Sequence, residues 1–364
     1  MCNDTSQVGR RSSPGGTQPG IALSRDGRLL FLTRFIRLFG YGLISIILVL
    51  YLAEIGVSGP RIGLLLTLTL VGDTVISLWI STRADRAGRR QMLAIGALLL
   101  AGAGAVFGVT QTYWLLVLAA TIGVISPSGN EVGPFLSIEQ AALAHIVGDG
   151  ERTAVFARYH LAGSVATALG ALVAGSVVSG LQRSGWSPLT SFRVLIAVYA
   201  GLGVVLAGLF ARLTPAVELP PVRGVERRAP VLLGLHRSTQ VVLKLSSLFA
   251  LDAFGGGFVV QSIVVYWFHL RFGTLPSTLG AIFFGANLLA GASALAAVPL
   301  ARRIGLIRTM VFTHIPSNLL LMLVPAMPTL PLSIAVFLLR CSISQMDVPT
   351  RQSYVMAVVA PDER

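Results

Sequence analysis

Long apolar segments recur along the chain at short intervals, and they constrain its fold more than any other feature. Segments of about 20 or more residues with few charges are long enough to cross a hydrocarbon layer about 30 Å thick. The composition agrees, since 54% of the 364 residues are apolar and only 12% are charged. These features exclude a water-soluble domain and predict an all-α, polytopic membrane protein in contact with the lipid bilayer.

Ten membrane spans are predicted, and they leave no room for a large domain outside the membrane. A Gly/Ser/Pro-rich segment at residues 1–28 is expected to form a disordered cytoplasmic tail. The longest polar connection, residues 213–238, is rich in proline and arginine and is expected to form a cytoplasmic central loop. The predicted spans are residues 29–52, 60–81, 91–110, 113–146, 154–180, 190–212, 240–269, 277–300, 306–327 and 331–358.

The basic residues indicate the orientation of the chain. A net charge of +13 would suggest a nucleic-acid partner for a soluble protein, but membrane topology explains it here. With the N-terminus inside, 18 of the 28 Lys and Arg residues fall in cytoplasmic segments and four in outer segments. We therefore expect a multi-pass protein of the cytoplasmic (plasma) membrane with a cytoplasmic N-terminus and no nucleic-acid partner.

The sequence carries signs of an internal duplication. Residues 56–63 align with residues 273–280, and both segments lie between the end of one span and the start of the next. The same shift along the chain aligns Gly88 with Gly305. Several short matches at one spacing predict two related halves.

The two predicted halves differ in length. Residues 29–212 form an N-terminal half of six helices, and residues 239–364 form a C-terminal half of only four. The second copy would stop just after the counterpart of the fourth span, so two helices of the duplicated unit are expected to be missing.

One aspartate lies among several arginines between the second and third predicted spans. Residues 81–90 read Ser-Thr-Arg-Ala-Asp-Arg-Ala-Gly-Arg-Arg. This segment resembles motif A of the major facilitator superfamily, G-x-x-x-D-R/K-x-G-R-R/K, with Ser81 in place of the leading glycine. The resemblance implies twelve helices in two six-helix halves, a substrate site between the halves, and alternating access. It therefore implies an MFS-like bundle with 6 + 4 of the 6 + 6 helices present.

The motif A-like segment is expected to act as a conformational latch. A carboxylate among arginines accepts charge-assisted hydrogen bonds and interacts favourably with a helix N-terminus. The resemblance implies that this aspartate braces the outward-open state against the eleventh helix of the family. The alternative is that the arginines only anchor the topology. The candidate latch residues are Asp85, Arg86, Gly88, Arg89 and Arg90.

Ionisable residues inside the spans are candidates for substrate binding or ion coupling, because charges in lipid are costly unless they face a partner or a water-filled cavity. Arg34 and Arg37 lie one helical turn apart, and we expect Asp73 to pair with one of them. Snorkelling to the nearby surface is the alternative for the two arginines. The candidates are Arg34, Arg37, Asp73, Glu131, Arg158, Asp252, Asp347 and Arg351.

The fourth span is predicted to be broken, because proline and glycine recur within residues 126–134. A shift that is one residue shorter than that of the duplication aligns Glu131 of this segment with Asp347 of the tenth span. Either carboxylate is a candidate for binding a proton. Alternatively, both stay ionised as gating partners of Arg158 and Arg351, or Asp347 and Arg351 neutralise each other across one helical turn.

The sequence thus predicts a secondary active transporter of a small solute, with proton coupling as an open question. We expect a monomer with no catalytic residue, cofactor or metal site. One alternative is a non-transporting membrane sensor of the same fold. Another is an integral membrane enzyme that modifies lipids, but the sequence has no Asp-x-x-Asp or His-Glu-x-x-His pattern to support it.

Overall fold

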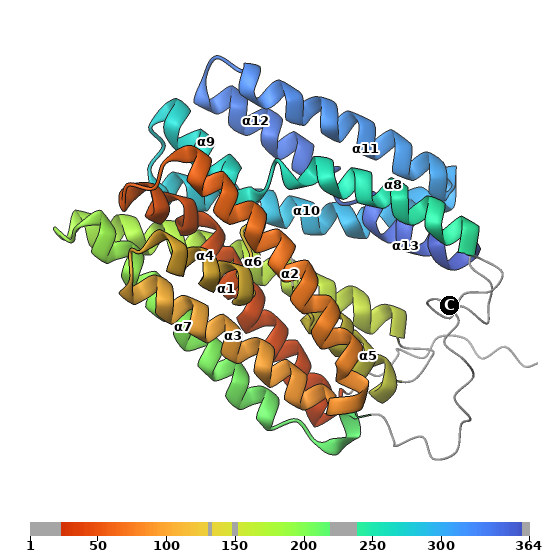
Figure 1. Ribbon diagram of the computed structural model, residues 1–364. Helices are drawn as coiled ribbons and strands as arrows, with labels where there is room; N and C mark the ends of the chain where they lie inside the picture. The colour runs from red at the N-terminus through yellow and green to blue at the C-terminus, as the bar shows by residue number, and fades with distance from the viewer. Residues whose placement is uncertain (1–22, 130–132, 148–151, 219–238, 359–364) are drawn as a thin grey trace, which may run out of the picture.

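A computed structural model of the chain describes residues 23–129, 133–147, 152–218 and 239–358, and these ranges are helical without strands (Figure 1). The fold confirms an all-α, polytopic bundle. The helices of the first half are α1 (Arg25–Glu54), α2 (Gly59–Ala87), α3 (Arg89–Val109), α4 (Tyr113–Ile122), α5 (Phe135–Ile146), α6 (Arg152–Arg183) and α7 (Pro188–Ala211). The helices of the second half are α8 (Thr239–Gly257), α9 (Gln261–Phe272), α10 (Pro276–Ile304), α11 (Leu306–Leu323), α12 (Leu330–Cys341) and α13 (Asp347–Val358). Short 3-10 turns occur at η1 (Pro215–Val217) and η3 (Val324–Ala326).

Eight helical segments within the described ranges are long and apolar enough to cross a membrane. Helices α4 and α12 are shorter apolar helices, and each is followed by a further helix after a break. Together these ten segments correspond to the ten predicted spans.

Three spans predicted as single segments are divided in the structure. The span at 113–146 contains α4 and α5, that at 240–269 contains α8 and α9, and that at 331–358 contains α12 and α13. Only the first break was expected from the sequence. The second follows a run of three glycines, which favour a helix end because they lack a side chain. The third break ends where α13 begins, and Pro349 lies in the first turn of that helix. Proline is tolerated there because the first turn of a helix does not need its backbone N–H groups.

The boundaries of the helices repeat with the spacing found in the sequence. The shift that aligns the two halves in the sequence also aligns the helix starts. It matches the first residues of α2, α3 and α4 with those of α10, α11 and α12, respectively. Gly88 and Gly305 separate the paired helices and both have positive φ angles, of 100° and 86°. Glycine suits this position because other residues adopt such a conformation at a cost. The equivalent turns therefore have similar backbone geometry in the two halves.

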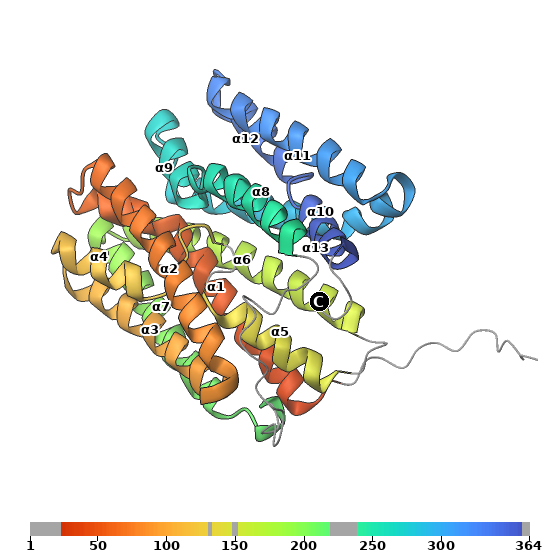
Figure 2. The same cartoon turned by 45° about the vertical axis from the view of Figure 1, so that its right-hand side comes forward.

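The two halves lie side by side, with α1–α7 in one group and α8–α13 in the other (Figures 1 and 2). Helix α6 packs closely on α10. A Cβ atom on Gly175 of α6 would lie 2.1 Å from the carbonyl oxygen of Pro276, and one on Gly280 would lie 2.7 Å from that of Ala171. No side chain fits at either position, so the two glycines allow the backbones to touch.

Hydrogen bonds also join the halves where α1 meets α9 and where α6 meets α10. The Ser262 hydroxyl donates to the carbonyl oxygens of Ser45 and Pro127, in each case at 2.8 Å. Ser45 and Ser262 are related by the shift of the duplication, so equivalent positions of the two halves meet here. The Ser277 N–H donates to the Ser179 hydroxyl at 2.9 Å. We refer to this region of contact between the halves as the closed end.

Helices α1 and α8 are equivalent in the duplication but differ in how far they are covered. The most apolar window of α1 is 83% buried, whereas that of the segment Gln240–Phe272 is 17% buried. Helix α1 packs against α6 and α7. The described part of the second half holds no counterpart of these two helices, and α8 is exposed as a result.

Helix α1 begins at Arg25, before the predicted start of the first span. The disordered tail expected at residues 1–28 therefore extends too far, because its last four residues are helical. The Ser24 hydroxyl accepts a hydrogen bond from the Gly27 N–H at 3.1 Å and caps the helix. The Asp26 carboxylate accepts hydrogen bonds from the N–H and hydroxyl of Thr214, at 3.2 and 2.5 Å. These polar contacts extend the helix beyond its apolar part, which is the only part that hydropathy detects.

Candidate functional site

A buried ion pair joins α1 to α5 in the first half. Arg37 donates from Nη1 and Nη2 to Oε1 and Oε2 of Glu139, at 2.7 and 2.8 Å, and both side chains are 0% exposed. The Tyr159 hydroxyl of α6 donates to Oε2, and the Thr33 hydroxyl donates to Oε1 at 3.3 Å. Because four hydrogen bonds reach this carboxylate, the pair is well satisfied in apolar surroundings.

Arg34 lies one turn before Arg37 and is buried as well, so neither arginine reaches the surface as the snorkelling alternative supposed. The guanidinium of Arg34 lies 4.3 Å from the centre of the Tyr159 ring, in a cation–π arrangement. Its Nη2 is 3.5 Å from Nδ1 of His160. The two arginines therefore connect α1 to α5 and α6.

The expected pair between Asp73 and one of these arginines is not present. Asp73 lies beside Ser77 and Gly133. Within the described ranges it has no ion-pair partner. The expectation was wrong because Glu139, which comes from α5, supplies the carboxylate that Arg37 contacts.

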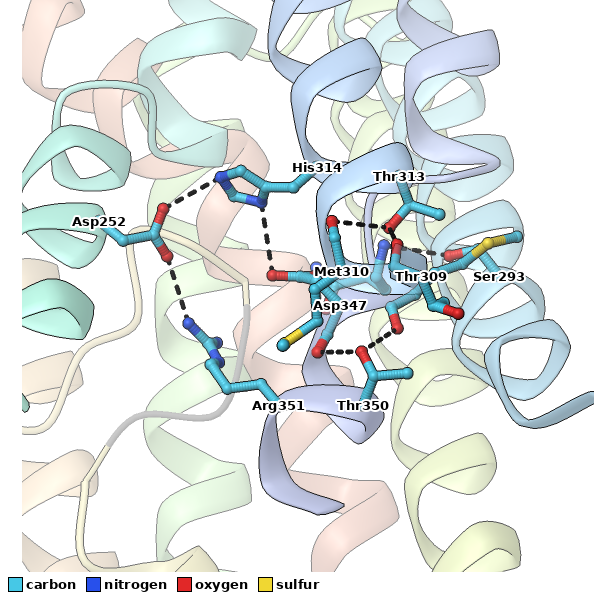
Figure 3. A network of polar contacts seen from close by, with 11 residues as sticks. Asp252, Ser293, Thr309, Met310, Thr313, His314, Asp347, Thr350 and Arg351 are labelled. Atoms are coloured by element: carbon cyan, nitrogen blue, oxygen red, sulfur yellow. Dashed lines mark hydrogen bonds and ion pairs between the residues drawn. The ribbon is translucent and has the colours of Figure 1, made fainter. Parts of the chain in front are cut away.

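A second polar cluster lies in the other half and connects α8, α11 and α13 (Figure 3). The His314 imidazole lies between two carboxylates, with Nε2 3.1 Å from Oδ1 of Asp252 and Nδ1 3.4 Å from Oδ2 of Asp347. Arg351 Nη1 donates to Oδ2 of Asp252 at 3.2 Å. We call Asp252, His314, Asp347 and Arg351 the C-half network.

The C-half network is less enclosed than the Arg37–Glu139 pair. The side chains of Asp252, His314 and Arg351 are 40%, 37% and 29% exposed, and that of Asp347 is 13% exposed. Two carboxylates and one guanidinium carry a net charge of −1 if His314 is neutral and of zero if it is protonated. A proton on His314 would therefore balance the charge of the whole network.

The network includes three residues that the sequence singled out, but their pairing differs from the expected one. Asp347 and Arg351 do not neutralise each other across one turn of α13. Asp347 is the first residue of that helix and faces His314, whereas Arg351 reaches α8 and also lies 5.1 Å from the centre of the Phe249 ring. The break before α13 frees Asp347 to face a neighbouring helix.

A cavity of about 220 Å³ lies between the halves, mostly within the second. Its walls come from α8 to α12, from the segment between α12 and α13, and from Ser128 of the first half. Arg340, in the last turn of α12, is the one charged residue among the described lining residues. The polar side chains in the wall belong to Ser128, Gln261, Asn287, Arg340, Ser344 and Gln345.

The motif A-like segment is mostly helical rather than a loop. Helix α2 continues to Ala87, and Gly88 alone separates it from α3. The Glu218 carboxylate, which follows α7, accepts hydrogen bonds from the backbone N–H groups of Arg89 and Arg90 at 2.6 and 3.1 Å. The carboxylate of Glu218, a residue outside the motif, thus caps the positive end of α3.

The guanidinium groups of the motif reinforce this contact. Arg89 Nη1 donates to the carbonyl oxygen of Val217 at 3.2 Å, and Arg90 Nη2 donates to that of Ala211 at 2.9 Å. Asp85 and Arg86 lie in the last turn of α2, and their side chains are outside the described part of the structure. The latch role of Asp85 therefore stays a prediction.

The expected pairing of Glu131 with Arg158 stays a prediction, because Glu131 is outside the described residues. Arg158 is exposed on α6. The described ranges also contain no group of three or more His, Cys, Asp or Glu side chains arranged to hold a metal ion.

Sequence reasoning missed His314 and Glu218, and it left Glu139 and Arg340 off the list of candidates. Glu139 and His314 lie in mostly apolar spans, where an ionisable residue is itself a sign of a site. Glu218 had no such signal, because it lies in a polar connection.

Residues 30–364 match the profile of the Major Facilitator Superfamily. The chain is 32% identical to the membrane protein YJR124C of Saccharomyces cerevisiae over 366 residues, which cover 93% of this chain and 82% of that protein. Two solved structures have similar folds, each with a TM-score of 0.67 and covering 93% of this chain. One is a bacterial homologue of the human lysosomal transporter Spinster, at 14% identity over 76% of its length. The other is the nucleoside transporter NupG, at 13% identity over 85% of its length.

Proposed function

The chain belongs to the Major Facilitator Superfamily, and from this premise we propose that it couples the movement of a small solute to the movement of protons. It is a secondary transporter rather than an enzyme. The proposed site of proton binding is the C-half network of Asp252, His314, Asp347 and Arg351. The proposed unit is a monomer in the plasma membrane.

The position of His314 between two carboxylates is the observation that carries this proposal. A neutral imidazole has one N–H and donates to only one of two acceptors, whereas a protonated imidazole donates from both ring nitrogens. Each ring nitrogen of His314 lies within 3.4 Å of a carboxylate oxygen. The geometry therefore suits a proton that the network gains and loses as charge balance changes.

The Arg37–Glu139 pair is better suited to a permanent structural role. Both side chains are withdrawn from the surface, and Glu139 is already satisfied by Arg37, Tyr159 and Thr33. A proton on Glu139 would break the bidentate ion pair with Arg37, which is costly in a buried site. We therefore assign the exchange of protons to the more open C-half network.

Alternating access follows in this proposal from the contacts between the halves. The predicted topology places the closed end, with Ser45, Ser262, Ser179 and Ser277, on the outer side of the membrane. The conformation described here would then release solute to the cytoplasm. Access from outside would require these hydrogen bonds to break and the halves to meet near α5 and α13 instead.

A pH gradient across proteoliposomes tests proton coupling. A pH-sensitive dye inside the vesicles reports proton entry while a panel of candidate solutes is added outside. At least one solute should move the internal pH with the native chain, and His314→Gln should abolish this change while keeping the fold.

His145→Gln is the matched control, because His145 is exposed at the end of α5 and outside the network. This control should behave like the native chain. Equal proton entry with His314→Gln would overturn the assignment to this network, and solute flux without any proton entry would overturn proton coupling itself.

A further inference from the structure

We propose that the cavity beside Arg340 binds a small monocarboxylate, so that the transported solute carries one negative charge. This inference rests on the proposed transport function for its biological meaning. It depends on the charge, the hydrogen-bonding groups and the size of the cavity between the halves.

Arg340 brings an uncompensated positive charge to the cavity. Its Nε atom is buried and has no hydrogen-bond partner, and within the described ranges no carboxylate lies at ion-pair distance from its guanidinium. A charge inside a membrane protein costs several kcal/mol unless a partner or water balances it. An anionic solute would supply that partner, and a carboxylate matches the planar fork of a guanidinium.

The rest of the described wall favours a solute with a single negative charge. The other polar groups of the cavity are hydroxyls and amides, which bind neutral parts of a solute. The described lining contains no second cation for a dianion and no carboxylate for the ammonium group of a zwitterion. Its volume of about 220 Å³ lies below the roughly 300–1,000 Å³ of sites for drug-sized ligands, which suits a small solute.

The cavity and the C-half network share one segment of chain. Arg340 lies at the end of α12 and Asp347 at the start of α13, with residues 342–346 between them. Ser344 and Gln345 of this segment line the cavity, and the Gln345 N–H donates to the Ser293 hydroxyl of α10 at 3.1 Å. A solute held by Arg340 would therefore affect the segment that positions Asp347 in the network.

Thermal unfolding of the purified full chain in detergent tests the charge preference. The probes are acetate, lactate, pyruvate, benzoate and nicotinate, each compared with its uncharged primary amide at equal ionic strength. At least one carboxylate should raise Tm more than its amide does. The inference is overturned if no carboxylate raises Tm, or if the amides stabilise the chain equally.

Variants at Arg340 test the site. Arg340→Gln should weaken binding of the stabilising carboxylate by roughly 10- to 100-fold, because a hydrogen-bonded charge pair is lost. Arg340→Lys should retain part of the affinity, and it shows whether the position tolerates substitution. Arg308→Gln, at an exposed arginine of α11, removes the same charge outside the cavity and should bind like the native chain.

Equal weakening by Arg308→Gln and Arg340→Gln would mean a general effect of charge and would overturn the site. Binding in detergent involves no proton gradient. Failure of the His314→Gln experiment would therefore leave this result standing, and failure here would leave proton coupling standing.

Discussion

Arg37 and Glu139 form a bidentate ion pair with both side chains completely buried. The pair links the first helix of the bundle to the half of the fourth span that follows its break. Two residues from distant parts of the sequence thus add a charged contact to the apolar packing of α5, in which Phe135 stacks on Phe210 of α7.

Loss of one partner of this pair should destabilise the chain strongly. Glu139→Gln would remove the bidentate ion pair with Arg37, and removal of one partner of a buried pair costs about 3–5 kcal/mol in proteins. Equilibrium unfolding in mixed micelles with increasing SDS measures this change. Glu54→Gln is the control, since Glu54 is exposed at the end of α1 and should change stability little. If Glu139→Gln lowers the free energy of unfolding by less than about 1 kcal/mol, the pair contributes no more than an exposed salt bridge does.

Substitution of Gly175 should separate α6 from α10. The new Cβ atom of Gly175→Ala would lie 2.1 Å from the carbonyl oxygen of Pro276, so the helices must move apart. We expect a loss of about 1–3 kcal/mol from overpacking. Gly180→Ala is the control on the same helix, because its Cβ atom would meet nothing within 4 Å.

The closed end is tested by adding Ser179→Cys to both the Gly175→Ala and the Gly180→Ala chain. This substitution introduces a thiol beside the N-terminus of α10. A membrane-impermeant maleimide should label this thiol faster in the Gly175→Ala chain than in the Gly180→Ala chain. Identical labelling rates would show that contact at Gly175 does not hold the closed end together.

Removal of the Glu218 carboxylate should loosen the junction between α2 and α3. Glu218→Ala would leave the backbone N–H groups of Arg89 and Arg90 without their acceptor, and loss of a helix cap costs about 1 kcal/mol. Glu218→Gln should cost less, because the amide oxygen still accepts a hydrogen bond. Thermal unfolding at low and high salt separates the effects of charge and hydrogen bonding. Glu54→Ala serves as the exposed control, and a Glu218→Ala chain as stable as this control would argue against the cap.

Helix α8 should become more mobile when Arg351 is changed. Arg351→Gln removes the ion pair with Asp252 and the contact with the Phe249 ring, both of which tie α8 to α13. Amide hydrogen exchange in α8 should become about twofold to fivefold faster, as expected for a partly exposed pair. Lys244→Gln on the same helix removes an exposed charge and should leave exchange unchanged. Unchanged exchange in Arg351→Gln would mean that the pair does not restrain α8.

Much of the fold follows from the apolar segments. Hydropathy located all ten spans, and the spacing of the internal duplication appears again in the starts of three pairs of helices. The breaks before α9 and α13 were less accessible to sequence reasoning. A run of glycines precedes the first of these breaks and Pro349 follows the second, but packing decides whether such residues interrupt a helix.

The candidate sites were harder to predict because their partners lie far apart in the sequence. Arg37 and Glu139 are separated by 102 residues, and Asp252 and Arg351 by 99. Helical spacing indicates which residues share a face of one helix but not which helix that face meets. It therefore favoured Asp347 with Arg351, whereas the structure pairs each of them with a residue from another helix.

Within the described ranges α8 is sparsely covered, which makes its position sensitive to its surroundings. A well-packed helix is held in place by its neighbours, whereas few described residues cover α8. Its attachment to α11 and α13 depends on His314 and Arg351 rather than on a large apolar contact. Bilayer thickness and lateral pressure would then compete with only a few polar contacts, so the same chain is expected to hold α8 differently in thin and thick membranes.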